Sequence, residues 1–138
     1  MYLLDTNVLS ELSKRTPDER VRAWFERAQP DQLWLSVLVV GEIRVGIAQR
    51  ARRDARAAAR LATWLEGVVA EHRSRILAVT RRVAEVWGPL NVPDRLPTID
   101  GLLAATAFVH DLTLVTRNVR DVARTGVRVL NPFDDDCG

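Results

Sequence analysis

The stretch MYLLDTNVLSEL (Met1–Leu12) sets an aspartate directly after the short apolar run Tyr2–Leu4. A run of this length forms a strand when both of its faces are covered, and the pattern from Asn7 to Ser13 then becomes helical. Asp5 therefore falls at the carboxyl end of the first predicted strand. It either caps the following helix or, if Asn7 caps that helix, is left available for another role.

Four further short apolar runs alternate with helical patterns along the rest of the chain. Strands are expected at 33–35, 75–79, 112–116 and 127–130, and helices at 17–28, 37–50, 51–71, 81–90 and 99–110. Ser36, Thr80 and Thr98 stand at the N-cap positions of three of these helices. This alternation predicts an α/β fold with a mainly parallel sheet covered on both faces. Sites in such folds lie beyond the carboxyl ends of the strands.

The composition suits one domain over residues 1–138, because 47% of the 138 residues are hydrophobic and 28% are charged. No apolar run approaches the ~20 residues of a membrane-spanning helix, and the first residues lack the pattern of a secretory signal. Cys137 is the single cysteine, so neither disulfides nor a cysteine metal site hold the fold. We expect a soluble protein of a bacterial or archaeal cytoplasm.

The positive charges are almost all arginine, since Lys14 is the only lysine; the net charge is +2 and the pI is near 9.3. Arginine binds phosphates through paired donors, although GC-rich coding alone would produce the same bias. The run QRARRDARAAAR (Gln49–Arg60) is either a solvated helix face or a surface that faces RNA or a partner. Residues 134–138 are expected to form a frayed acidic tail.

Two further acids map to the same predicted sheet edge as Asp5. Glu42 lies beside apolar surface on its helix, where an ionised carboxylate needs a cation or an ion pair with a distant arginine. Gly41 and Gly46 flank it and would let other backbone approach closely. Asp100 stands in the first turn of its helix, where the helix dipole alone would favour an acid.

The turn after the fourth predicted strand adds Thr116, Asn118 and Asp121, although polar residues are expected in any such turn. Carboxylates gathered from separate elements repel one another, and hard cations such as Mg²⁺ or Mn²⁺ are the usual reason for gathering them. No histidine or cysteine lies at metal-ligand spacing from these acids, which argues against zinc. His72 and His110 are expected to be surface or helix-end residues.

Four segments of the chain closely resemble PIN-domain proteins of the VapC toxin family, in particular its FitB-like and plasmid-stability branch. They are LLDTNVLSEL (3–12), LSVLVVGEIRVGI (35–47), LPTIDGLLAATAFVHDLTLVTRN (96–118) and VRDVARTGVRVLNPF (119–133). The resemblance spans Tyr2 to Phe133, and it rests on the order and spacing of the four segments together. It implies a PIN-like fold, a three-layer α/β/α sandwich.

The resemblance also implies an acidic pocket that holds one or two Mg²⁺ or Mn²⁺ ions. Asp5, Glu42 and Asp100 match its metal ligands, and the fourth position is either Asn118 or the nearby Asp121. The groups expected to carry catalysis are Asp5, Glu42, Asp100 and Asp121, with hydroxyl contacts from Thr6 and Thr116 and RNA-backbone contact from Arg117.

The implied function is that of a toxin of a type II toxin–antitoxin system, an endoribonuclease that cleaves RNA with a metal-activated water. Its implied partners are a cognate small antitoxin, an RNA substrate and a second copy in a homodimer, with DNA reached only through the antitoxin. The alternative is a non-nucleolytic PIN-like partner in a FitAB-type DNA-binding regulatory complex. Two other α/β classes fit poorly. A haloacid-dehalogenase-type phosphatase needs an aspartate where Asn7 stands, and a receiver domain needs a lysine near its last strand.

Overall fold

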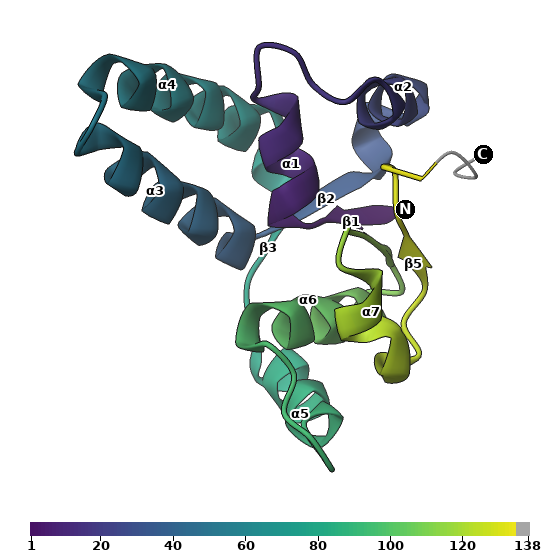
Figure 1. Cartoon of the computed structure of the whole chain (residues 1–138). Coiled ribbons are helices and arrows are strands. Elements are labelled where there is room, and N and C mark those ends of the chain that lie inside the picture. The colour runs from purple at the N-terminus through teal and green to yellow at the C-terminus, as the bar shows by residue number, and fades with distance from the viewer. Residues whose placement is uncertain (135–138) are drawn as a thin grey trace.

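The strand Tyr2–Leu4 (β1) lies at the centre of a parallel sheet in the computed structural model, which describes residues 1–134 (Figure 1). The other strands are β2 (Leu33–Ser36), β3 (Ile76–Leu77), β4 (Thr113–Val115) and β5 (Val129–Leu130). Within the described residues the sheet has five strands in the order β3-β2-β1-β4-β5. Every neighbouring pair is parallel, which confirms the prediction of a mainly parallel sheet.

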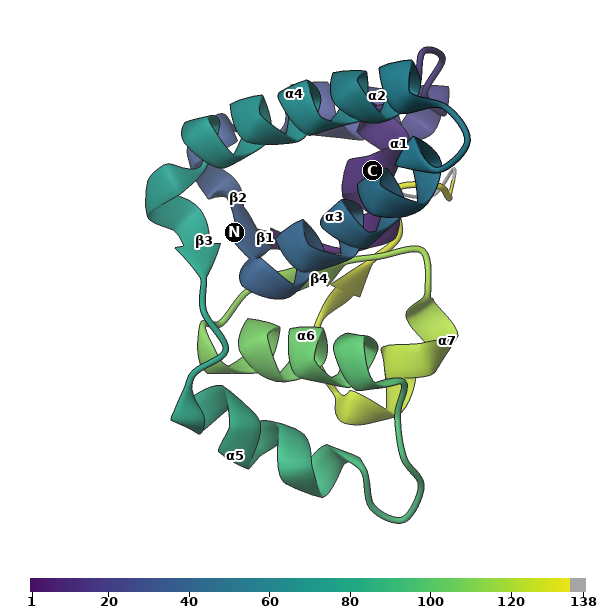
Figure 2. The same cartoon turned by 90° about the vertical axis from the view of Figure 1, so that its left-hand side faces the viewer.

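Helices cover both faces of the sheet, as the two views in Figures 1 and 2 show. One face carries α1 (Thr6–Leu12), α2 (Glu19–Arg27), α3 (Val37–Ala51) and α4 (Ala55–Glu71). The other face carries α5 (Arg81–Leu90), α6 (Thr98–Val109) and α7 (Val119–Val122). The three-layer α/β/α sandwich is therefore confirmed. Short 3-10 helices occupy Pro30–Gln32, Arg73–Arg75 and Ala123–Thr125.

The strand order changes direction at β1. The chain passes from β1 to β2 and β3 on one side, and then returns to the other side of β1 as β4 and β5. Tyr2 consequently pairs with Leu33 in β2 and with Thr113 in β4. The carboxyl ends of β1 and β4 meet at this switch point, where open α/β sheets bind their ligands. Asp5 follows β1 at this edge, and Thr116 follows β4.

The core lies between the sheet and its two helix layers. Leu3 and Leu4 of β1 are fully buried, as expected for a central strand covered on both faces. Helix α2 buries Val21 and Trp24 against the sheet face that also carries α1, α3 and α4. The ring centroids of Trp24 and Tyr2 lie 5.2 Å apart, and the two rings meet edge-on. The apolar side of α2 is therefore part of the core.

Two of the three expected caps are confirmed. Ser36 Oγ accepts a hydrogen bond from the Leu38 N–H at 3.0 Å, and Thr80 Oγ1 accepts one from the Val83 N–H at 3.2 Å. The prediction for Thr98 is wrong, because this residue is already the first of α6. The position before it is held by Pro97, which has no side-chain acceptor to offer.

The helix expected from residue 51 to residue 71 is in fact two elements. Asp54 accepts a hydrogen bond from the Ala57 N–H at 3.0 Å and so caps a new helix, α4, that begins at Ala55. Residues 52–54 form a turn, and α3 and α4 pack against each other as a hairpin. Helix α2 likewise begins later than expected, at Glu19 after the cap Asp18, and β3 is shorter than the predicted strand 75–79.

His72 and His110 both end helices, but only His110 is exposed. His72 is 3% exposed, and its Nδ1 lies 2.9 Å from the Val68 carbonyl oxygen, so it is a buried helix-end residue, which agrees with the expected surface or helix-end position. Of the expected acidic tail, Asp134 is exposed and residues 135–138 lie outside the described part of the chain. None of the helices described is long and apolar enough to cross a bilayer.

Candidate active site

Asp5 is fixed at the carboxyl end of β1 by hydrogen bonds to both carboxylate oxygens. Its Oδ1 accepts from the Thr6 N–H at 2.6 Å, which makes Asp5 the N-cap of α1. Its Oδ2 accepts from the Thr116 hydroxyl at 2.6 Å, and its own N–H donates to the Val115 carbonyl at 2.9 Å. Asp5 thus caps a helix and faces the switch point at once, so the two roles weighed for it are not exclusive.

Asn7 does not cap α1; it connects the turn after β1 to the turn after β4. Its amide nitrogen lies 3.3 Å from Asp5 Oδ2 and 3.4 Å from Thr116 Oγ1. The side-chain oxygen of Asn7, Oδ1, accepts a hydrogen bond from the Arg117 backbone N–H at 3.1 Å. Asn7 therefore holds together two turns that lie far apart in the sequence. Sequence reasoning missed this role, because it treated Asn7 only as a local cap.

Glu42 approaches the same edge from α3. The Thr6 hydroxyl donates to Glu42 Oε1 at 2.5 Å, so the residue after Asp5 orients the second carboxylate. Glu42 is half-buried, and the described residues contain no ion pair between it and an arginine. Gly41 and Gly46, on either side of Glu42, were expected to allow other backbone to approach closely. This prediction is wrong, because an added Cβ at either position would have nothing within 4 Å.

Asp100 brings a third carboxylate from the first turn of α6. Burial raises its pKa to about 6, and the negative charges of Asp5, Asp121 and Glu42 contribute in that order. Burial also raises the pKa of Asp5, against the lowering effect of the Thr116 and Thr6 hydrogen bonds. The charges of four acids from four separate elements therefore act on one another at this edge.

The two polar residues after β4, Asn118 and Asp121, differ in their positions and interactions. Asn118 is exposed at the N-terminus of α7, and its N–H donates to Thr116 Oγ1 at 3.0 Å. Asp121 lies one turn further on, in α7, where its charge acts on Asp100. Of these two residues, Asp121 is therefore the one whose charge acts on a carboxylate of the cluster, Asp100.

Arg117 stands on the rim of the site, next to Thr116. Its guanidinium carbon lies 4.5 Å from the centre of the Phe133 ring, in a cation–π contact. Phe133 itself is buried, so it gives the long Arg117 side chain a fixed support. The sequence contains no local signal for this pairing, because the two residues are brought together only by β5 and the segment after it.

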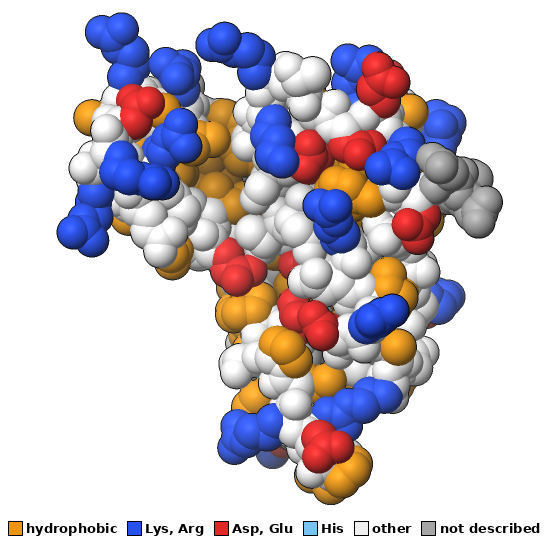
Figure 3. All heavy atoms as spheres, in the orientation of Figure 1, with side chains coloured by type: hydrophobic (Ala, Val, Ile, Leu, Met, Phe, Trp, Pro, Cys, Tyr) orange, Lys and Arg blue, Asp and Glu red, His pale blue; other side chains and the backbone are white. Residues whose placement is uncertain are grey.

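The carboxylate cluster has oxygen donors and uncompensated charge. In residues 1–134, no basic side chain forms an ion pair with Asp5, Glu42, Asp100 or Asp121, and Figure 3 shows acidic side chains gathered where α1, α3 and α6 meet. No three His, Cys, Asp or Glu side chains in that part have a geometry that would hold a metal ion. Mg²⁺ prefers oxygen donors and usually keeps several waters. The donor chemistry therefore fits a cation bound partly through water.

The family model of the PIN domain matches residues 2–127. The chain belongs to the PIN domain family. Toxin FitB of Neisseria gonorrhoeae is 33% identical to this PIN domain over 98% of this chain and 100% of its own length. VapC ribonuclease Y4jK of Sinorhizobium fredii is 31% identical over 97% of this chain and 99% of its own length.

Solved structures of similar proteins share the architecture of this PIN domain. The crystal structure of FitAcB from Neisseria gonorrhoeae matches with a TM-score of 0.88 at 32% identity, over 96% of this chain and 99% of that chain. The structure of FitAB bound to the IR36 DNA fragment matches with a TM-score of 0.88 at 31% identity, over 97% and 96% of the two chains. The predicted family is thereby confirmed.

Proposed function

We propose that this PIN domain is the toxin of a type II toxin–antitoxin system and cleaves RNA as an endoribonuclease that depends on Mg²⁺, with Mn²⁺ as a substitute. The observation that carries the proposal is the cluster of Asp5, Glu42 and Asp100 at the switch point of the sheet, with no basic side chain in residues 1–134 to neutralise it. The similarity to FitB and to VapC ribonuclease Y4jK supports the same activity.

The residues of the cluster divide the work between binding and proton transfer. Asp5, Glu42 and Asp100 are the proposed metal ligands, directly or through water, and Asp121 takes the fourth position in preference to Asn118. A bound divalent cation would polarise the phosphodiester and acidify a water. Asp100 is the carboxylate that would position the attacking water and accept its proton.

Hydroxyl groups orient these carboxylates before any substrate binds. Thr6 fixes Glu42 through its hydroxyl, and Thr116 fixes Asp5 in the same way. Arg117, supported by Phe133, extends at the rim where it can contact an RNA phosphate. The turns after β1 and β4 thus align the site through Asn7, which bonds to both.

The proposal includes partners and a setting. A small cognate antitoxin would block the acidic cluster, and the complex would reach DNA through that antitoxin, as the similarity to FitAB bound to a DNA fragment suggests. A homodimer, a single PIN domain over residues 1–138 and a cytoplasmic location complete the proposal. Sedimentation of the purified chain alone would test the homodimer, and sedimentation with its antitoxin would test the complex of the two proteins.

A cleavage assay tests the nuclease activity. The purified chain is incubated with structured RNA and Mg²⁺, and the products are separated on a gel. We expect cleavage by the native chain and by an Asp31→Asn control, whose acid is exposed in the 3-10 helix ahead of β2, at the sheet edge opposite the cluster. Cleavage should be lost with EDTA and in Asp5→Asn and Asp100→Asn. Activity that survives all three treatments would contradict the metal-nuclease proposal.

The second candidate function is a non-nucleolytic subunit of a DNA-binding regulatory complex, which the match to FitAB on DNA favours. In that case the carboxylates serve only to bind the antitoxin. Mobility-shift measurements on promoter DNA distinguish the two functions. A complex that binds DNA normally with Asp100→Asn, together with a native chain that never cleaves RNA, would favour the second candidate.

A further inference from the structure

A groove runs from the acidic cluster along the cleft between α1 and the α3–α4 hairpin. Its inner part, about 400 Å³, is lined by Thr6 and Glu42 at one end and reaches Trp64 of α4. A second hollow of about 660 Å³ shares Arg50, Leu61 and Trp64 with the first and so continues it outward. In Figure 3 this region is a recess with an apolar floor and basic side chains around it.

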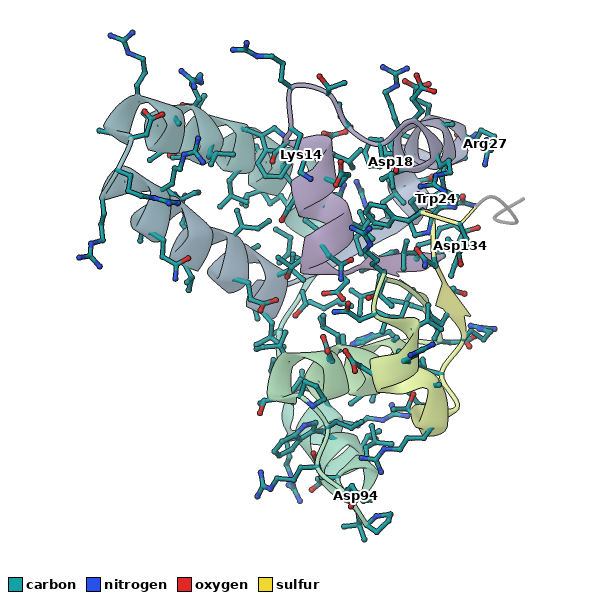
Figure 4. All side chains as sticks on the ribbon, in the orientation of Figure 1. Lys14, Asp18, Trp24, Arg27, Asp94 and Asp134 are labelled. Atoms are coloured by element: carbon teal, nitrogen blue, oxygen red, sulfur yellow. The ribbon has the colours of Figure 1, made fainter. Side chains whose placement is uncertain are left out.

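The walls of this groove are strongly basic. Apart from Glu42 at the inner end, the charged side chains that line the two hollows are Lys14, Arg15, Arg50, Arg53 and Arg60. All five are exposed. Of these five side chains, only Lys14 forms an ion pair within residues 1–134, with Glu11 at 2.9 Å. Figure 4 shows Lys14 beside α1 on the side that faces α4.

The turn at residues 52–54 divides the basic run Gln49–Arg60 between two surfaces. Arg50 on α3 and Arg60 on α4 line the same hollow from opposite arms of the hairpin. Arg52 and Arg56 are exposed but line neither hollow. The run therefore includes both a solvated face and a set of side chains directed at the groove, and this division depends on the cap at Asp54.

We propose that this groove binds single-stranded RNA, namely the part of the substrate strand that leads away from the carboxylate cluster. The inference rests on the proposed ribonuclease function and adds to it the path of the strand. A polyanion is the occupant that matches unpaired arginines, whose planar donors fit phosphate oxygens. Glu42 belongs both to the cluster and to the groove wall, so a strand in the groove reaches the acids without crossing another element.

Trp64 gives the groove a surface for the bases. The indole is half-buried on α4 and lines both hollows, next to Leu61. Aromatic rings bind unpaired bases by stacking, with little preference for sequence. From Glu42 to Arg50 the groove follows α3 for roughly 12 Å, given a rise of 1.5 Å per residue. This length suits a short single strand with phosphates along the basic wall and bases over Trp64.

The binding experiment uses the full chain with Asp100→Asn, so that RNA is bound without being cut, and a fluorescein-labelled oligoadenylate as the probe. Fluorescence anisotropy gives the Kd over a series of salt concentrations. We expect the double variant Arg50→Gln with Arg60→Gln to bind more weakly and to lower the log Kd against log salt slope by about 0.7 per lost phosphate contact. The matched control is Arg52→Gln with Arg56→Gln, which removes the same charge outside the groove.

Trp64 is tested in the same assay. Trp64→Ala should weaken binding about tenfold through the loss of stacking, whereas Trp64→Phe should retain most of the affinity. Circular dichroism and urea unfolding verify that each variant is folded, and the arginine variants provide the answer if Trp64→Ala is not.

Several results would overturn the proposal. They are an absence of probe binding by the Asp100→Asn chain, an equal loss of affinity in the arginine variant and its control, or unchanged RNA affinity in the arginine variant. If that variant loses affinity for the antitoxin while keeping its affinity for RNA, the groove is a protein-binding site instead. None of these outcomes depends on cleavage, so failure of the groove and failure of the nuclease proposal are separate results.

Discussion

Replacing Asp100 by asparagine is expected to stabilise the metal-free protein at pH 8, even though it removes a proposed metal ligand. Asp100 is half-buried, and burial together with the charges of Asp5, Asp121 and Glu42 raises its pKa to about 6. Because folding raises this pKa, the folded state binds the proton more tightly than the unfolded state. The ionised Asp100 therefore opposes folding, and stability falls as pH rises through the range from about 4 to 6.

The size of the effect follows from the raised pKa. One pKa unit corresponds to about 1.4 kcal/mol, so the full effect at pH 8 is about 3 kcal/mol before screening by solvent. Partial exposure reduces this to about 1–2 kcal/mol, and the variant also loses ~0.3–1 kcal/mol of favourable interaction with the α6 dipole. A net stabilisation of about 1 kcal/mol at pH 8 remains, and it shrinks toward zero as the pH falls to 4.

Urea unfolding in EDTA at pH 8 and pH 5 measures this difference, with Asp31→Asn as the control for loss of an exposed acid. Added Mg²⁺ should reverse the order, because a ligand at a hundred times its Kd stabilises the native chain by about 2.7 kcal/mol and the variant by less. The reasoning is refuted if Asp100→Asn is less stable than the native chain at pH 8 in EDTA, or if the difference does not change with pH.

Three further substitutions test separate features. Asp54→Ala removes the cap of α4 and should lower the free energy of unfolding by about 1 kcal/mol in urea titrations; no change would show that the turn does not need the cap. Gly67→Ala, in α4 with open space around it, should raise that free energy by ~0.5–1 kcal/mol, and a loss would contradict the open surroundings. Thr116→Val removes the hydrogen bond that lowers the pKa of Asp5, so this pKa should rise and the acidic limb of the pH–rate profile should move to higher pH. An unmoved limb would show that Asp5 does not control it.

Local signals in the sequence were sufficient for most of the fold. The strands are short apolar runs, and the caps Ser36 and Thr80 precede clear helical patterns, so both could be predicted from nearby residues. The break at Asp54 could not, because alanine and arginine on either side favour a continuous helix. The capped break is favoured over one continuous helix only because it lets α3 and α4 pack against each other.

The candidate site shows the same division between local and distant information. The carboxyl-edge rule alone predicts that Asp5, Glu42 and Asp100 lie close together. It left Asn118 and Asp121 as alternatives, because the electrostatic effect of Asp121 on Asp100 depends on the position of α7. Nor could it show that Asn7 joins turns that are 110 residues apart, since a side-chain hydrogen bond of that kind has no periodicity in the sequence.

The central position of β1 has a consequence for the chain while it is being made. Tyr2 must wait for Thr113 before one side of its strand is paired, and at ~5–20 residues per second this delay is on the order of ten seconds of translation. Asp5 and Thr116, which share a hydrogen bond, become neighbours only at the end of that interval. A ribosome-bound chain is therefore expected to lack the assembled β1–β4 edge, and with it the carboxylate site, until nearly all of the chain has emerged.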